Sequence, residues 1–142
     1  MDRKYICYCG FYCGNCATKV KVEPAAKILY EEMKKAGFEA LIPMIPDYDK
    51  FWSFLKDMAV NGTCISCKEG SGHPKCKIRM CAIEKNIEMC TFCEIYPCEY
   101  FTELLEVCPI LADDNSVLQE EGMDTWSKLQ DGRQARGFTY TD

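Results

Sequence analysis

Cys-Gly-Phe-Tyr-Cys-Gly-Asn-Cys is the sequence of residues 9–16, and Cys-Thr-Phe-Cys-Glu-Ile-Tyr-Pro-Cys follows at residues 90–98. The chain has 142 residues and 12 cysteines, and all but one of the cysteines fall into two blocks, residues 7–16 and 64–98. Free buried thiols have no reason to cluster in this way, whereas metal and redox proteins need several thiols close together. We therefore expect the fold to be organised around these blocks.

The rest of the composition is that of a folded cytoplasmic protein. Hydrophobic residues make up 48% of the chain, and the formal net charge is −5. No apolar run approaches the roughly 20 residues that cross a bilayer, and no apolar segment follows the charged start as it does in a signal peptide. Thiols stay reduced in the cytoplasm, so we expect metal-bound thiols there rather than six disulfides.

Three Cys-x2-Cys units occur, at residues 13–16, 64–67 and 90–93. Such a turn presents two sulfurs on one side of a tight loop, and zinc prefers four ligands, often thiolates, in a tetrahedron. Sites made entirely of cysteine are closed and structural. The spacing predicts two or three zinc sites but leaves open which thiols share an ion. Their ligands are expected among Cys9, Cys13, Cys16, Cys64, Cys67, Cys76, Cys81, Cys90, Cys93 and Cys98.

Three further residues are weaker candidates. Cys7 and Cys108 lie outside the dense runs and are typical of ordinary buried thiols. His73, the only histidine, is separated from Cys76 by two residues, which is a spacing found between metal ligands. A lone histidine in a Gly-rich loop is nevertheless more typical of an exposed side chain. Whether His73 is a ligand is left open.

An iron–sulfur cluster is the alternative to zinc. The spacing Cys9-x3-Cys13-x2-Cys16 is that of radical SAM enzymes, which hold a [4Fe–4S] cluster with three thiolates. Those enzymes build a barrel, which needs roughly 200 residues or more, and the residues after this motif predict a helix instead. A simpler iron–sulfur redox or sensor protein stays open as the alternative function.

The remaining charged residues suggest no catalytic residue. The cations of the second block, Lys68, Lys75, Lys77, Arg79 and Lys85, are suited to neutralising a Zn(Cys)4 site, whose formal charge is near −2. The overall acidity argues against a nucleic-acid surface. The acidic pair Asp113-Asp114 is typical of a solvated surface, and no catalytic motif is present.

The gap between the two cysteine blocks predicts two helices. A proline in the first turn and Gly37 at the end favour a helix over residues 24–36. A second helix, capped by Asp47 or Asp49, ends at Asn61. The apolar residues expected to pack inward from these helices are Ile28, Leu29, Met33, Phe51, Trp52, Phe54, Leu55 and Met58.

Three more helices are predicted at residues 77–86, 99–107 and 125–136, and Pro109 stops the second of them. No stretch alternates as a strand does. The sequence therefore predicts a mostly α fold, a small single domain over residues 1–142 in which helices carry irregular metal-binding Cys-rich loops. The residues expected to face inward in these three helices are Ile78, Cys81, Ala82, Phe101, Leu104, Leu105, Trp126 and Leu129.

Together the cysteine motifs resemble the DUF3795 family. The resemblance is carried by residues 9–16, by Cys-Lys-Ile-Arg-Met-Cys-Ala at 76–82 and by residues 90–99, and the tail at 126–140 is similar as well. The family groups cysteine-rich prokaryotic proteins of unknown function that are thought to bind zinc. The resemblance implies a cytoplasmic protein with the same ten cysteine ligands and no known activity. Its partner would be an unknown protein or small ligand that contacts the helical surface.

Overall fold

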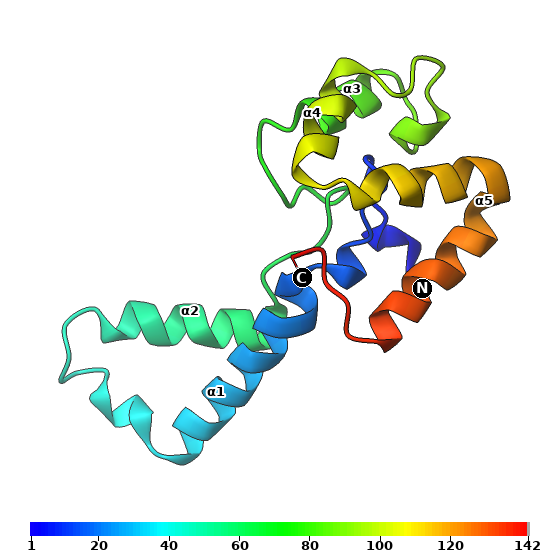
Figure 1. The fold of residues 1–142 in the computed structure, drawn as a ribbon. Coiled ribbons are helices and arrows are strands. Elements are labelled where there is room, and N and C mark those ends of the chain that lie inside the picture. The colour runs from blue at the N-terminus through cyan, green and yellow to red at the C-terminus, as the bar shows by residue number, and fades with distance from the viewer. Residues whose placement is uncertain (142) are drawn as a thin grey trace. The chain divides into compact units, whose positions relative to one another are not determined.

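The computed structural model describes residues 1–141 and is built from α-helices joined by loops and short 3₁₀ turns (Figure 1). The described residues contain no β-strand, only an isolated bridge between Ile6 and Tyr12. The predicted mostly α fold is confirmed. The chain divides into two compact units, and a single domain over residues 1–142 stays a prediction. No helix among the described residues is long and apolar enough to span a membrane.

The hairpin unit, Ala17–Cys64, consists mainly of two helices. Helix α1 spans Glu23–Lys35, and Gly37 after it adopts the left-handed conformation with φ 79°. Helix α2 spans Tyr48–Asn61, and both helices match the predicted ones to within a residue or two. Their location follows from the proline in the first turn of α1 and the glycines that follow each helix.

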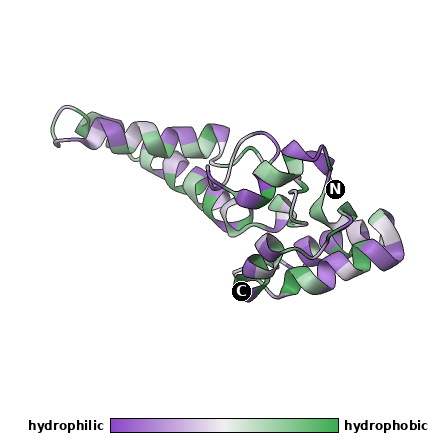
Figure 2. Ribbon diagram, turned by 90° about the horizontal axis from the view of Figure 1, so that it is seen from above, coloured by the Kyte–Doolittle hydropathy of each residue, from purple (hydrophilic) through white to green (hydrophobic). Residues whose placement is uncertain are grey.

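The core of the hairpin unit agrees in part with the predicted one, since Trp52 and Leu55 are buried as expected. Tyr30 of α1 and Trp52 of α2 pack with ring centroids 5.2 Å apart, and Ala26 and Leu55 complete the buried cluster. The small alanine lets the two helices approach while the aromatic rings fill the space between them. Figure 2 shows hydrophobic and hydrophilic residues along both helices. The prediction of an inward face was wrong for Ile28, Leu29, Phe51 and Phe54, which are exposed.

The cysteine unit contains Met1–Cys16 and the residues from Ile65 onward. Helices α3, Lys77–Glu84, and α4, Glu99–Val107, match their predictions closely. They pack through a core in which Ile78, Phe101 and Leu111 are buried. The predicted inward positions Ala82 and Phe101 are fully buried.

Helix α5 spans Ile110–Ala135 and is longer than the helix predicted at 125–136. It bends at Gly122, whose φ of 82° and ψ of 177° interrupt the helical backbone. The second arm carries Trp126, which is fully buried as predicted. The first arm was missed because its buried face mixes apolar and polar residues. The bend lets the two arms of α5 contact each other through side chains.

Candidate metal centre

The Cys7 thiol lies at the centre of one group of sulfurs. Its Sγ is 3.1 Å from the Sγ of Cys13, and the thiols of Cys67 and Cys9 are also within hydrogen-bonding reach. These hydrogen bonds, together with burial, raise the pKa of Cys7 above its ordinary value. Four thiols from two stretches far apart in sequence therefore meet at one place in the cysteine unit.

A tight turn brings Cys7 to Cys13. The Cys7 N–H donates to the Phe11 carbonyl at 2.8 Å, and the Gly10 N–H donates to the Cys7 carbonyl at 3.1 Å. Gly10 has φ +92°, and a Cβ at this position would overlap the side-chain oxygen of Asn115. Only glycine meets both demands, so Gly10 sets the path of the chain between the two thiols.

The Cys67 thiol has the opposite electrostatic setting. Its hydrogen bond with Cys7 lowers the pKa to about 6 against the effect of burial, and the Tyr8 N–H and the Arg79 guanidinium act in the same direction as Cys7. The Ser71 carbonyl holds that guanidinium through a hydrogen bond of 2.6 Å. A predicted cation of the second block, Arg79, therefore stabilises the thiolate form of a predicted ligand.

A second group of thiols lies in the neighbourhood of Cys90. Burial raises the pKa of Cys90 to about 12, and the negative charge of the neighbouring thiols adds to the shift. The Nζ atom of Lys85 lies 3.8 Å from the Sγ of Cys93 and supplies a positive charge at this group. The thiols that act on Cys90 in this way are those of Cys9, Cys98, Cys81 and Cys93.

Each group includes the first thiol of a Cys-x2-Cys turn, and the two turns have the same backbone form. The 3₁₀ turns Cys13–Asn15 and Cys90–Phe92 are both flanked by extended residues. The Cys16 N–H donates to the Cys13 carbonyl at 3.0 Å, and the Cys93 N–H donates to the Cys90 carbonyl at 2.9 Å. The tight loop expected from the x2 spacing is therefore present in both groups.

The thiols suit zinc in kind, but their sulfurs are not spaced as a ligand shell. Two thiolates bound to one tetrahedral zinc ion stand about 3.8 Å apart, given Zn–S bonds of about 2.3 Å. The sulfurs of Cys7 and Cys13 are closer than that. Within residues 1–141, no three His, Cys, Asp or Glu side chains are arranged as a site ready for a metal ion. Binding would require the sulfurs to move apart.

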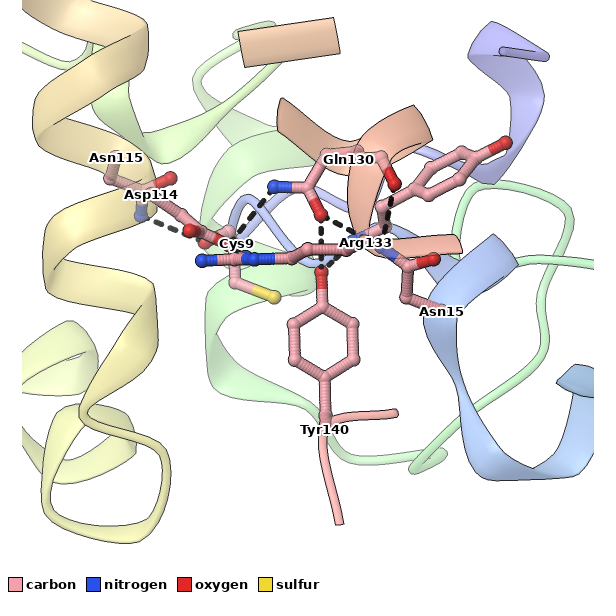
Figure 3. Close-up of polar contacts among 8 residues, drawn as sticks. Cys9, Asn15, Asp114, Asn115, Gln130, Arg133 and Tyr140 are labelled. Atoms are coloured by element: carbon pink, nitrogen blue, oxygen red, sulfur yellow. Dashed lines mark hydrogen bonds and ion pairs between the residues drawn. The ribbon is translucent and has the colours of Figure 1, made fainter. Parts of the chain in front are cut away.

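A buried polar network, shown in Figure 3, connects residues 9–16 to α5 and to Tyr140. The Asn15 amide donates to the Gln130 side-chain oxygen at 2.9 Å, and the Tyr140 hydroxyl donates to that same oxygen at 3.3 Å. The Tyr12 N–H donates to the Tyr140 hydroxyl at 3.0 Å. The Asn115 amide donates to the backbone carbonyl of Cys9 at 3.1 Å. These contacts fix the loop by groups other than the thiols.

Asp114 joins the two arms of α5 within this network. Its carboxylate accepts from the Gln130 amide at 3.0 Å and from the Arg133 guanidinium at 2.5 Å. The Asp114 side chain is fully buried, so the prediction of a solvated Asp113-Asp114 pair was wrong for Asp114. Leu111 and Leu118, spaced by two turns around Asp114, carry the signal that places this part of the helix face inside.

The remaining predicted ligands lie at three other places in the chain. Cys16 closes the first turn, Cys64 lies in the hairpin unit, and Cys76 precedes α3 and packs against the core of the cysteine unit. His73 is exposed, and its Nδ1 accepts from the Lys75 N–H at 3.2 Å.

The two cysteines predicted to be ordinary buried thiols, Cys7 and Cys108, differ from each other in their surroundings. Cys108 is buried in the core beside Ile78, Phe101 and Leu111, as an ordinary thiol would be, and burial raises its pKa. Cys7 is also buried, but its side chain meets other thiols. Sequence spacing missed Cys7 because a turn of the chain, and not a Cys-x2-Cys unit, brings it to Cys13.

The motif Cys9-x3-Cys13-x2-Cys16 does not lie in a barrel, since the described chain has no strands to form one. A search of curated proteins and a search of solved structures each gave no match. Residues 5–103 match the family DUF3795, described as a protein of unknown function. The matched residues include all eleven cysteines of the two blocks, but neither Cys108 nor the similar tail at 126–140. Because it spans more than half of the chain, the protein belongs to the DUF3795 family.

Proposed function

We propose that this protein binds zinc through the thiols of its cysteine unit and that the ion holds the irregular loops of that unit together. The observation that supports the proposal most strongly is the meeting of Cys7, Cys13 and Cys67, with Cys9 beside them. A protein without a use for these thiols would gain nothing by gathering them, since a thiol packs as well alone in an apolar core.

Zinc is favoured over other ions by the donor set. Clustered thiolates without a histidine or carboxylate suit a closed, four-coordinate site, which is structural rather than catalytic. The guanidinium of Arg79 beside Cys67 and the ammonium of Lys85 beside Cys93 offset the negative charge that such sites carry. The buried hydrogen bonds to residues 9–16 hold the loop in place, as hydrogen bonds around a metal site orient its ligands.

The test compares the zinc content of Cys7→Ser with that of Cys108→Ser. Both cysteines are buried, so each substitution places a hydroxyl in the interior, but only the Cys7 thiol shares hydrogen bonds with other thiols. We expect Cys7→Ser to lose bound zinc at a chelator concentration that leaves Cys108→Ser and the natural chain loaded. Equal retention in the two variants would contradict a role for Cys7, and a natural chain free of metal would contradict the proposal as a whole.

The iron–sulfur alternative is separated by preparing the protein without oxygen in medium that supplies both iron and zinc. Zinc-bound thiolates give a colourless protein, whereas an iron–sulfur cluster gives a brown one with visible absorption. We expect a colourless protein with zinc and no acid-labile sulfide. Stoichiometric sulfide and iron in the anaerobic preparation would favour the cluster instead.

A further inference from the structure

We propose that the cysteine unit holds two metal ions rather than one, and that the second ion is bound by Cys81, Cys90, Cys93 and Cys98. This inference rests on the zinc-binding function proposed above and assigns a separate set of ligands within it. The first ion would remain with the group around Cys7, which includes Cys13 and Cys67. The ligand class of both sites is a thiophilic divalent cation in an all-thiolate shell.

The four thiols of the second site come from three pieces of backbone. Cys81 lies on α3, Cys90 and Cys93 flank one 3₁₀ turn, and Cys98 directly precedes α4. The Cys98 carbonyl accepts from the Phe101 N–H at 3.0 Å, which fixes that residue to the first turn of α4. Residues of α3 and α4 share one core, and Cys90 and Cys98 pack against that same core.

The backbone of Tyr8 contacts both groups of thiols. Its carbonyl accepts from the Cys90 N–H at 2.7 Å, while its N–H is directed to the Cys67 thiol. The backbone of one residue therefore contacts a member of each group. Cys9, the next residue, lies near both Cys7 and Cys90. Two ions at these positions would be neighbours, joined by the backbone at residues 8–9.

Each group also has a cation of its own. Arg79 lies beside Cys67 in the first group, and Lys85 lies 3.8 Å from the Sγ of Cys93 in the second. A zinc ion with four thiolates carries a formal charge near −2, and one adjacent cation reduces the excess at each site. A single ion would leave one of the two cations without this function.

The first measurement uses the natural chain, so it does not depend on any variant folding. The purified protein is loaded with ¹¹³Cd²⁺ in place of zinc, and the cadmium spectrum is recorded. We expect two resonances of equal area, both in the region of all-sulfur coordination. One resonance, or two in which one shows oxygen or nitrogen ligands, would overturn the assignment, whereas no bound cadmium or zinc would overturn the proposed function itself.

The second measurement uses a matched pair of variants, Cys13→Ser and Cys90→Ser. Each removes the first thiol of a Cys-x2-Cys turn, and the two turns have the same backbone form. We expect each variant to keep about half of the metal bound by the natural chain and to lose a different cadmium resonance, with the double variant binding none. Loss of both resonances in one folded single variant, judged by its helix signal, would indicate one shared cluster and contradict two separate sites.

Discussion

At the scale of single residues, Gly10 is the position on which the cysteine turn depends most. Its φ of +92° and its contact with Asn115 leave no room for a side chain, whereas Gly70, at φ +100°, has open space around it. Comparing alanine at the two positions therefore separates the cost of the backbone conformation from the cost of the clash.

We expect Gly10→Ala to lower the free energy of unfolding of the cysteine unit by about 2–4 kcal/mol, as the sum of a left-handed alanine and an overpacked contact. Gly70→Ala should cost about 1 kcal/mol, from the backbone conformation alone. Denaturant unfolding of both variants at equal zinc concentration measures the difference. Equal losses would show that the Asn115 contact has no energetic weight.

Asp114 is the second residue whose substitution should destabilise the fold, because its buried carboxylate is paired with Arg133. Asp114→Asn keeps the shape of the side chain but removes the charge that faces Arg133 and Gln130. We expect a loss of about 3 kcal/mol, because a largely buried guanidinium is left without its partner. The matched control is Asp113→Asn, an exposed neighbour on α5, which should cost less than about 1 kcal/mol. Similar unfolding midpoints for the two variants would contradict the structural role of Asp114.

At the scale of elements, the hairpin unit is closed by Glu23 at the start of α1. Its carboxylate accepts from the Thr63 N–H at 2.9 Å and lies 3.0 Å from the Lys19 ammonium. Burial disfavours the charged form, but the Thr63 and Lys19 contacts outweigh it, so the pKa of Glu23 lies below its usual 4.5. One side chain therefore links the beginning of α1 to the segment after α2.

The lowered pKa of Glu23 gives a pH dependence with a defined sign. A depressed carboxyl pKa stabilises the folded state above pH 4.5, and this contribution is lost as the pH falls below that value. We expect Glu23→Gln to weaken the hairpin by about 1–2 kcal/mol at pH 7 and to abolish this acid-dependent part. Hydrogen exchange of the α1 amides measures it, with the exposed Glu31→Gln as the control. An acid dependence that survives in Glu23→Gln would contradict this origin.

How far the sequence predicts each element depends on what forms that element. Helices α1, α2, α3 and α4 follow from local signals, proline and glycine at their ends and apolar spacing within them. The inward faces of α1 and α2 follow only in part, because each helix has two partly apolar faces. The faces with Tyr30 and Trp52 pack together, and the other faces are exposed. The first arm of α5 was hidden by polar residues whose partners lie 16 and 19 positions away.

The cysteine turns of the candidate site could be predicted from the sequence, but the contacts between distant thiols could not. Spacing identifies the Cys-x2-Cys turns, and the structure contains two of them in the expected form. It does not identify Cys7, which reaches Cys13 through the Gly10 turn, or the Asn15–Gln130 contact, whose members are 115 residues apart. Contacts of that range depend on the packing of whole elements, which local patterns do not encode.

At the scale of the whole molecule, the two units should respond differently to metal removal. The cysteine-free stretch 17–63 holds its helices by packing around Trp52, whereas Trp126 is buried in the unit that carries the clustered thiols. Labelling with 5-fluorotryptophan gives one fluorine resonance for each of the two tryptophans, which Trp→Phe variants assign. We expect a strong chelator to shift and broaden the Trp126 resonance and to leave that of Trp52 in place. An unchanged Trp126 resonance after complete metal removal would show that no ion supports that unit.

The most direct test of zinc binding is a joint count of metal ions and reactive thiols in the natural chain, purified without oxygen and without denaturant. Bound thiolates are protected from thiol reagents, so the count links the ion to the sulfurs that hold it. We predict about two zinc ions per chain, with most of the 12 thiols unreactive until a chelator releases the metal. Native protein without metal, in which the thiols react before any chelator is added or are found joined as disulfides, would contradict the account.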